Sequence, residues 1–379
     1  MAAPTITGGT RLAPQVRATS GSSRHTVRGV NYRRVREPVS GRAYTLVRVH
    51  TGSGLTGYGE CPEVPLSELR RLGEHLLEQP ATAVEPARHR LAAYPRVRAA
   101  ADMALLDISA KIAGVPVYQL LGGPTRHKVR PLAKIDGRTD SELEAEMKRA
   151  RAAGYRAFAI PLPEVQTGVK RLDAFVKAVT ARLESLRAAG GAEVDFVLDA
   201  GSALTPGEAA TVAAAIERLH PLWIDEPCPV SNLATLSKIS EESVAPVGFG
   251  RGFTTGGAFQ DLLREGLIDV LRPDIALNGI TGIRRLAAMA ETYYTAVAPY
   301  HDGGPVATAA ALQLAASLPN FFIQQIPFPI DKKDRDMRTA LTGGSVELVE
   351  EGFAKLPRGP GLGIELDMDA LKEYTEEMA

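Results

Sequence analysis

The stretch VAPVGFGRGF, residues 244–253, is a short apolar run that leads into a glycine turn, with Arg251 at its end. Two earlier runs have the same form but end in acids: FVLDAG reaches Asp199, and LWIDEP reaches Asp225. Short apolar runs bounded by turn residues are typical of buried strands in a parallel sheet. These stretches therefore predict strands that carry charged side chains at their ends.

Runs of this kind alternate with longer amphipathic stretches from about residue 128 onward. We take their last residues as Asp136, Pro161, Asp199, Asp225, Arg251, Asp274, His301 and Gln325, which lie 25, 38, 26, 26, 23, 27 and 24 residues apart. Eight such units predict an α/β fold, a TIM-like (β/α)8 barrel. A doubly wound open sheet is the competing fold, but it usually has fewer units, and no G-x-G-x-x-G motif follows a strand here.

The flanking segments predict a second, smaller α+β domain. AYTLVRVHT and LTGYGE, joined by GSG, have the pattern of a β-hairpin, and residues 100–123 contain a helical apolar period that Gly114 ends. After residue 345 the alternation loosens, and a loop with a short strand returns toward the first domain. We therefore expect a capping domain at 1–127, the barrel at 128–345 and a C-terminal segment at 346–379.

Composition excludes several classes of protein. The 379 residues are 45% hydrophobic and 23% charged, and Lys+Arg and Asp+Glu both number 44. This balance gives no basic field for nucleic acid and no polybasic patch for a membrane surface. No apolar run approaches the roughly 18–20 residues of a spanning helix, and residues 1–15 lack the apolar core of a signal peptide. A cytoplasmic location is the expectation.

The strand ends are the candidate site, because side chains at the C-terminal ends of barrel strands converge on one mouth. A single aspartate at such a position is often the N-cap of the following helix. Five charged residues around one mouth are harder to explain in that way: Asp136, Asp199, Asp225, Arg251 and Asp274.

The chain as a whole, from about Val27 to Tyr374, resembles the enolase superfamily in its mandelate racemase and muconate lactonizing branch. The hairpin, the helical stretch that follows it, LRPDIALNGITGIRRLAAMAE, GPVATAAALQLAASLPNF and PRGPGLGIELD carry this resemblance. It implies a capping domain completed by the C-terminal segment, and a homo-oligomer, either a dimer or an octamer. It also implies abstraction of a proton α to a carboxylate, with Mg²⁺ on acids of strands three to five stabilising the enediolate.

The match at the implied metal site is partial. Asp199 and Asp225 fall on the first two ligand positions, but Arg251 falls on the third. A guanidinium only donates hydrogen bonds and cannot ligate a cation. We therefore expect Arg251 to lie between the two acids as a built-in cation, with no cofactor. Mg²⁺ on Asp199 and Asp225, with a shifted ligand such as Glu226, is the alternative, and Arg251→Glu is expected to rebuild part of such a site.

The match at the implied bases is also partial. The two lysine positions of strand two fall on Ala159 and Pro161, which transfer no proton. Asp274 keeps the strand-six aspartate, while the strand-seven histidine falls on Tyr300, with His301 next to it. Histidine titrates near pH 6.5 and tyrosine near 10, so His301 is the preferred proton carrier and Tyr300 a hydrogen-bond donor.

These observations predict an isomerase or lyase without Mg²⁺. It would isomerise, eliminate from or cyclise a small carboxylate or carbonyl substrate. The expected catalytic residues are His301, Tyr300, Asp274 and Arg251, and the expected substrate-binding residues are Lys134, Asp136, Asp199, Asp225, Asp302 and Gln325. Two alternatives stay open: a non-catalytic binding or scaffold protein that keeps the barrel, and a Mg²⁺-dependent racemase or dehydratase with shifted ligands.

Overall fold

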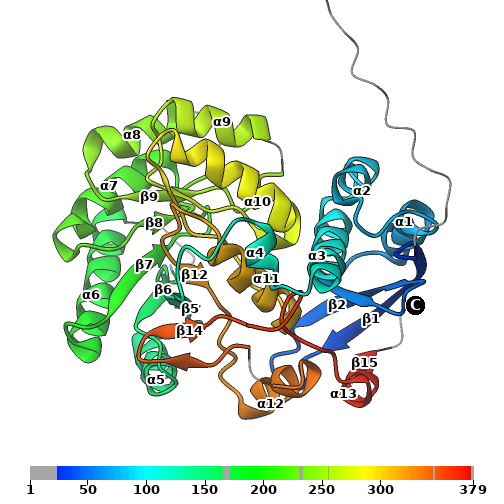
Figure 1. Ribbon diagram of the computed structural model, residues 1–379. Coiled ribbons are helices and arrows are strands. Elements are labelled where there is room, and N and C mark those ends of the chain that lie inside the picture. The colour runs from blue at the N-terminus through cyan, green and yellow to red at the C-terminus, as the bar shows by residue number, and fades with distance from the viewer. Residues whose placement is uncertain (1–23, 165–170, 230–233, 255, 345, 377–379) are drawn as a thin grey trace, which may run out of the picture.

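The structure, a computed structural model, describes residues 24–164, 171–229, 234–254, 256–344 and 346–376. The N-terminal stretch considered for a signal peptide lies outside these residues. Figure 1 shows an antiparallel sheet with its helices beside a barrel that helices surround. None of the described helices is both long enough and apolar enough to span a bilayer.

The capping domain is built on a four-stranded sheet in the order β15-β1-β2-β3. Its strands are β1 (Val27–Arg36), β2 (Ala43–Thr51), β3 (Thr56–Pro62) and β15 (Thr375–Glu376). Its helices are α1 (Leu66–Leu76), α2 (Val84–Arg90), α3 (Pro95–Ala113), α4 (Val117–Leu120) and α13 (Met368–Glu373). The hairpin is confirmed, because β2 and β3 pair antiparallel from Tyr44 and Pro62 to His50 and Thr56. The C-terminal segment also returns as expected, since β15 pairs with β1.

The barrel is an eight-stranded parallel sheet in the order β11-β10-β9-β8-β7-β6-β5-β12. Its strands are β5 (Pro131–Lys134), β6 (Ala157–Pro161), β7 (Asp195–Asp199), β8 (Ile224–Asp225), β9 (Val247–Phe249), β10 (Val270–Leu271), β11 (Ala296–Val297) and β12 (Gln324–Gln325). A parallel bridge between Val297 and Phe321 joins β11 to the segment before β12 and closes the ring. The expected TIM-like barrel is thus confirmed.

Helices follow the barrel strands in turn and surround the sheet (Figure 1). They are α5 (Asp140–Ala152), α6 (Leu172–Gly190), α7 (Pro206–Ile216), α8 (Ala234–Glu242), α9 (Gly256–Arg264), α10 (Ile275–Glu291), α11 (Pro305–Ala315) and α12 (Lys332–Leu341). A 3-10 turn, Glu217–Leu219, extends α7. A separate small sheet joins β4 (Lys128–Val129) to β14 (Phe353–Lys355) and β13 (Val349–Glu350).

Several barrel strands end earlier than the sequence suggested. β5 ends two residues before Asp136, β9 ends two before Arg251, β10 ends at Leu271 and β11 at Val297. Gly250, with φ of 127°, turns the chain after β9. Pro273 and Pro299 lack the N–H groups that a ladder needs, so they limit β10 and β11. Extended backbone continues beyond them, because Asp274 and Tyr300 still form an isolated parallel bridge.

Candidate functional site

The centre of the barrel mouth is an ion cluster of two acids and two arginines. Arg251 donates from Nη1 to Asp199 Oδ2 (3.1 Å), and its Nη2 lies 3.1 Å from Asp199 Oδ1 and also bonds to Asp225. The Asp225 side chain is completely buried, and that of Arg251 is 16% exposed. The structure thus brings together the three charged residues that end or follow β7, β8 and β9, as their order along the chain predicted.

The second arginine, Arg272, was not recognised from the sequence. It follows β10, is fully buried, and donates from Nε to both Asp225 oxygens at 3.0 and 3.2 Å. Its Nη1 donates to the Ala298 carbonyl and its Nη2 to Gln325 Oε1 (2.8 Å). Burial lowers the pKa of Arg272 to about 10, so it remains a cation at neutral pH. A charged residue inside the apolar run VLRPD was the signal available in the sequence.

Glu226 hydrogen-bonds to the backbone at Gly250 and Arg251 and so stabilises the loop that carries the Arg251 side chain. Its Oε1 accepts the amide N–H groups of Gly250 (2.7 Å) and Arg251 (2.8 Å). Its own backbone has a φ of 46°, an unusual conformation for a residue other than glycine. Burial raises the pKa of its carboxyl. The Glu226 carboxylate is therefore engaged through Oε1 by the loop after β9.

The donor set does not suit the Mg²⁺ ion that the resemblance implies. Mg²⁺ requires oxygen lone pairs in near-ideal octahedral geometry at about 2.0–2.1 Å. Each of the four carboxylate oxygens of Asp199 and Asp225 instead accepts or faces an arginine N–H. Among the described residues, no group of three His, Cys, Asp or Glu side chains is placed to hold a metal ion.

Asp274 and Tyr300 line a cavity of about 230 Å³ between the mouth and the capping domain. The Asp274 carboxylate accepts the Ala276 amide (2.8 Å) and N-caps α10, as a strand-end aspartate often does. Burial, reinforced by the nearby charge of Asp302, raises the pKa of Asp274 to about 7. The group is thus placed to exchange a proton near neutral pH.

Tyr300 joins this cavity to the ion cluster. The Arg251 guanidinium carbon lies 4.6 Å from the centre of the Tyr300 ring, a cation–π distance, and that of Arg272 lies 5.8 Å away. Burial raises the pKa of Tyr300 above its usual value, so the hydroxyl keeps its proton at neutral pH. Tyr300 is therefore suited to donate a hydrogen bond.

His301 lines the same cavity as Tyr300, but its ring nitrogens are hydrogen-bonded to other protein groups. Its Nδ1 accepts the Gly303 amide (3.3 Å), which leaves Nε2 to carry the proton toward Thr308 Oγ1 (2.8 Å). The ring is buried, and burial together with the charges of Arg338 and Arg42 lowers its pKa well below 6.5. Because both ring nitrogens have protein partners, this geometry does not favour His301 as the proton carrier that the sequence suggested.

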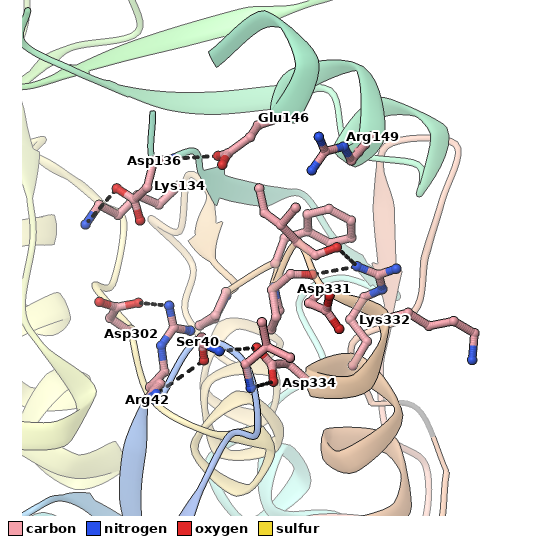
Figure 2. Close-up of a pocket in the computed structure, with 16 residues that line it drawn as sticks. Ser40, Arg42, Lys134, Asp136, Glu146, Arg149, Asp302, Asp331, Lys332 and Asp334 are labelled. Atoms are coloured by element: carbon pink, nitrogen blue, oxygen red, sulfur yellow. Dashed lines mark hydrogen bonds and ion pairs between the residues drawn. The ribbon is translucent and has the colours of Figure 1, made fainter. Parts of the chain in front are cut away.

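The remaining expected substrate-binding residues, Lys134, Asp136 and Asp302, line a larger cavity of about 570 Å³. Lys134 pairs with Asp136 (3.3 Å), and Asp302 pairs with Arg42 of the capping domain (3.4 Å). Figure 2 shows both pairs on the same side of this cavity. Asp302 lines the smaller cavity as well, so the two cavities adjoin. Gln325 lies apart from both: it is buried and accepts from Arg272.

The capping domain reaches the barrel mouth through Glu60 of β3. The Glu60 carboxylate accepts the amides of Gly304, Val306 and Ala307 at the N-terminus of α11, the last two at 3.1 Å. Glu60 also lines the smaller cavity. This contact could not be predicted from the sequence, because the partners of Glu60 are backbone groups on a helix distant in the chain.

Comparisons with known proteins agree with this architecture. Residues 26–122 match the mandelate racemase / muconate lactonizing enzyme N-terminal domain, and residues 142–370 match the enolase C-terminal domain-like family. A D-galactonate dehydratase of Ralstonia pickettii (strain 12J) is 29% identical over 88% of this chain and 91% of its own length. A D-mannonate dehydratase of Sphingomonas sp. (strain SKA58) is 31% identical over 74% of this chain and 75% of its own length.

Solved structures are similar over almost the whole chain. A putative galactarate dehydratase from Agrobacterium radiobacter, described with bound Na and L-malate, superposes with a TM-score of 0.84 at 26% identity. The superposition covers 93% of this chain and 95% of that one. A mandelate racemase/muconate lactonizing enzyme-like protein from Rubrobacter xylanophilus DSM 9941 has a TM-score of 0.83 at 26% identity, over 94% and 98% of the two chains.

Proposed function

The chain belongs to the mandelate racemase and muconate lactonizing enzyme family of the enolase superfamily, and from this we propose that it is a lyase that removes water from a small hydroxycarboxylate. The relatives named as galactonate and mannonate dehydratases support elimination over isomerisation or cyclisation. The observation that carries the proposal is Asp274, a carboxyl with a pKa of about 7 beside Tyr300 on a cavity at the mouth.

In this proposal, Asp274 is the proton carrier. Its ionised carboxylate takes the proton from the carbon α to the substrate carboxylate. The C–H electron pair forms the double bond as the β C–O bond breaks, and Asp274 returns the proton to the departing hydroxyl as water. Tyr300, which keeps its own proton, donates a hydrogen bond that orients the substrate.

Fixed positive charge for the developing anion comes from the protein. An α-carboxylate proton is weakly acidic, so its removal requires positive charge close to the carboxylate. Arg251, stacked on Tyr300 and partly exposed, is proposed to supply this charge at the cavity wall. The reaction is therefore proposed to need no divalent cation.

Binding without turnover is the second candidate. Ala159 and Pro161 lie where the family resemblance would place two basic lysines, and neither side chain can accept or donate a proton. A protein that retains the mouth but not the chemistry would still bind a small hydroxycarboxylate among Lys134, Arg42 and Asp274. The two candidates differ only in whether product forms.

The test is turnover of aldonic acids, aldaric acids and L-malate, with formation of a 2-keto acid or an unsaturated acid followed by NMR. We expect kcat/KM to rise with pH through about 7, because Asp274 must be ionised. Asp274→Asn should lower kcat by roughly 100-fold or more, while asparagine still caps α10.

Asp367→Asn is the matched control. Asp367 N-caps α13 in the capping domain, outside the site, so its turnover should equal that of the wild type. If calorimetry shows that an acid binds but no product forms under any condition, the result would favour the binding protein over the lyase. Full turnover by Asp274→Asn would exclude Asp274 as the proton carrier.

A further inference from the structure

Two arginines, not one, occupy the centre where the family resemblance places a metal ion. Arg251 bonds to both Asp199 and Asp225, and Arg272 bonds to both oxygens of Asp225. The two carboxylates carry two negative charges and the two guanidiniums carry two positive charges. The cluster is therefore neutral without any further cation.

The bonding of the acids leaves little for a cation to coordinate. Asp199 Oδ1 accepts the Gly201 amide (3.1 Å) in addition to facing Arg251. Asp225 is completely buried beneath the two guanidiniums. A divalent ion placed between the acids would meet N–H groups and positive charge instead of lone pairs.

We propose that Arg251 and Arg272 act together as a permanent organic cation that excludes divalent metal ions, and that a metal site returns only when both arginines are removed. After Arg251→Glu alone, Arg272 still neutralises Asp225 and donates to both of its oxygens. The expectation from the sequence was that this single substitution rebuilds part of a divalent-cation site; with Arg272 in place, we now expect the double substitution to be needed. The proposal does not depend on the lyase activity, because it concerns cation binding.

The experiment is a Mn²⁺ titration of the full-length protein, with free Mn²⁺ measured by electron paramagnetic resonance. Four proteins are compared: the wild type, Arg251→Glu, Arg272→Gln, and the double variant. We expect the wild type and Arg272→Gln to bind no Mn²⁺ at the cluster. The double variant should bind one ion at least tenfold more tightly than Arg251→Glu. Arg264→Glu, the same charge reversal at an exposed position on α9, is the control for nonspecific binding.

Two measurements keep the proposal testable even if the double variant does not fold. The Tm of the wild type should be the same in EDTA and in millimolar Mg²⁺, because a ligand that binds only the folded state raises Tm. A stoichiometric Mn²⁺ site in the wild type that Asp199→Asn or Asp225→Asn abolishes would overturn the proposal. Equal Mn²⁺ affinity of Arg251→Glu and a folded double variant would show that Arg272 has no part in the exclusion.

Discussion

Tyr300 and His301 are adjacent, yet their side chains contact different groups. Both side chains line the cavity with Asp274, but Tyr300 lies against Arg251, whereas both ring nitrogens of His301 are bonded inside the protein. We predict that Tyr300→Phe lowers kcat by about 10- to 100-fold with little change in Tm. His301→Ala should instead lower Tm, because it leaves buried partners unpaired, and should lower kcat less than Tyr300→Phe does.

The measurement is kcat and Tm for each variant on the same substrate. His301→Gln, which retains a donor and an acceptor, is the matched variant and should recover part of the stability lost in His301→Ala. A loss of kcat in His301→Ala larger than in Tyr300→Phe, with an unchanged Tm, would restore His301 as the proton carrier.

The ion cluster shows what the sequence could predict at this scale. Asp199, Asp225 and Arg251 could be brought together because residues at successive strand ends meet at a barrel mouth. The part that Arg272 plays in the cluster could not be predicted, because it follows a strand of two residues, too short for alternation to show which side chains point inward. Which of Tyr300 and His301 faces the mouth could not be predicted either, because β11 ends at Val297 and the direction of later side chains does not follow from strand alternation; both residues line the cavity.

At the scale of elements, the packing of β9 against Trp223 requires a glycine at position 248. A Cβ added to Gly248 would overlap Cδ1 and Nε1 of the Trp223 indole and lie 3.1 Å from Asp225 Oδ1. Trp223 is fully buried and stacks near Arg272, so it has little freedom to move. We predict that Gly248→Ala destabilises the protein by about 1–3 kcal/mol, the usual range for overpacking.

Urea unfolding measures this effect, and Gly207→Ala is its control. Gly207 lies in the first turn of α7, where an added Cβ would meet no neighbouring group within 4 Å and alanine is the better helix former. The stability of the Gly207→Ala variant should be equal to or greater than that of the wild type. A Gly248→Ala protein as stable as the wild type would mean that Trp223 can shift without cost.

Helices were easier to predict than strands. The 19-residue α3 has a long apolar period and ends at Gly114, whose left-handed φ of 70° is the conformation expected of a C-cap glycine. Barrel strands of two or three residues are too short for a period to appear, and β10 and β11 end at Leu271 and Val297, shortly before Pro273 and Pro299. The number and spacing of the strands were therefore predictable, and so were the last residues of β6, β7, β8 and β12, but those of β5, β9, β10 and β11 were not.

At the scale of the whole molecule, charged side chains bind the capping domain to the barrel. Arg338 of α12 bonds to Glu37 of the cap (2.6 Å) and to Glu347. Asp102 of α3 accepts the Thr281 amide (2.9 Å) in α10. Glu60 of the cap bonds to α11 in addition, so three barrel helices, α10, α11 and α12, are attached to the cap. The cavities at the mouth are therefore bounded by two domains whose relative position is fixed by buried polar contacts.

Glu60 gives this contact a pH dependence. Burial raises the pKa of Glu60 to about 7, above its ordinary value of 4.5. Between these two values the folded protein holds a proton that the unfolded chain has released. Stability from this group is therefore present at low pH and falls as pH rises from about 4.5 to 7, by at most about 1.4 kcal/mol per pH unit.

We predict that Glu60→Gln removes this slope. Glutamine cannot ionise, so the Tm of the variant minus the Tm of the wild type should increase between pH 5 and pH 8, whatever its value at pH 5. Thermal unfolding at several pH values measures this difference, with Glu74→Gln on the exposed face of α1 as the matched loss of a carboxylate. A difference that stays constant from pH 5 to pH 8 would mean that Glu60 titrates alike in the folded and unfolded states. In that case its three amide bonds fully compensate for its burial, and the contact between cap and barrel is insensitive to pH at this residue.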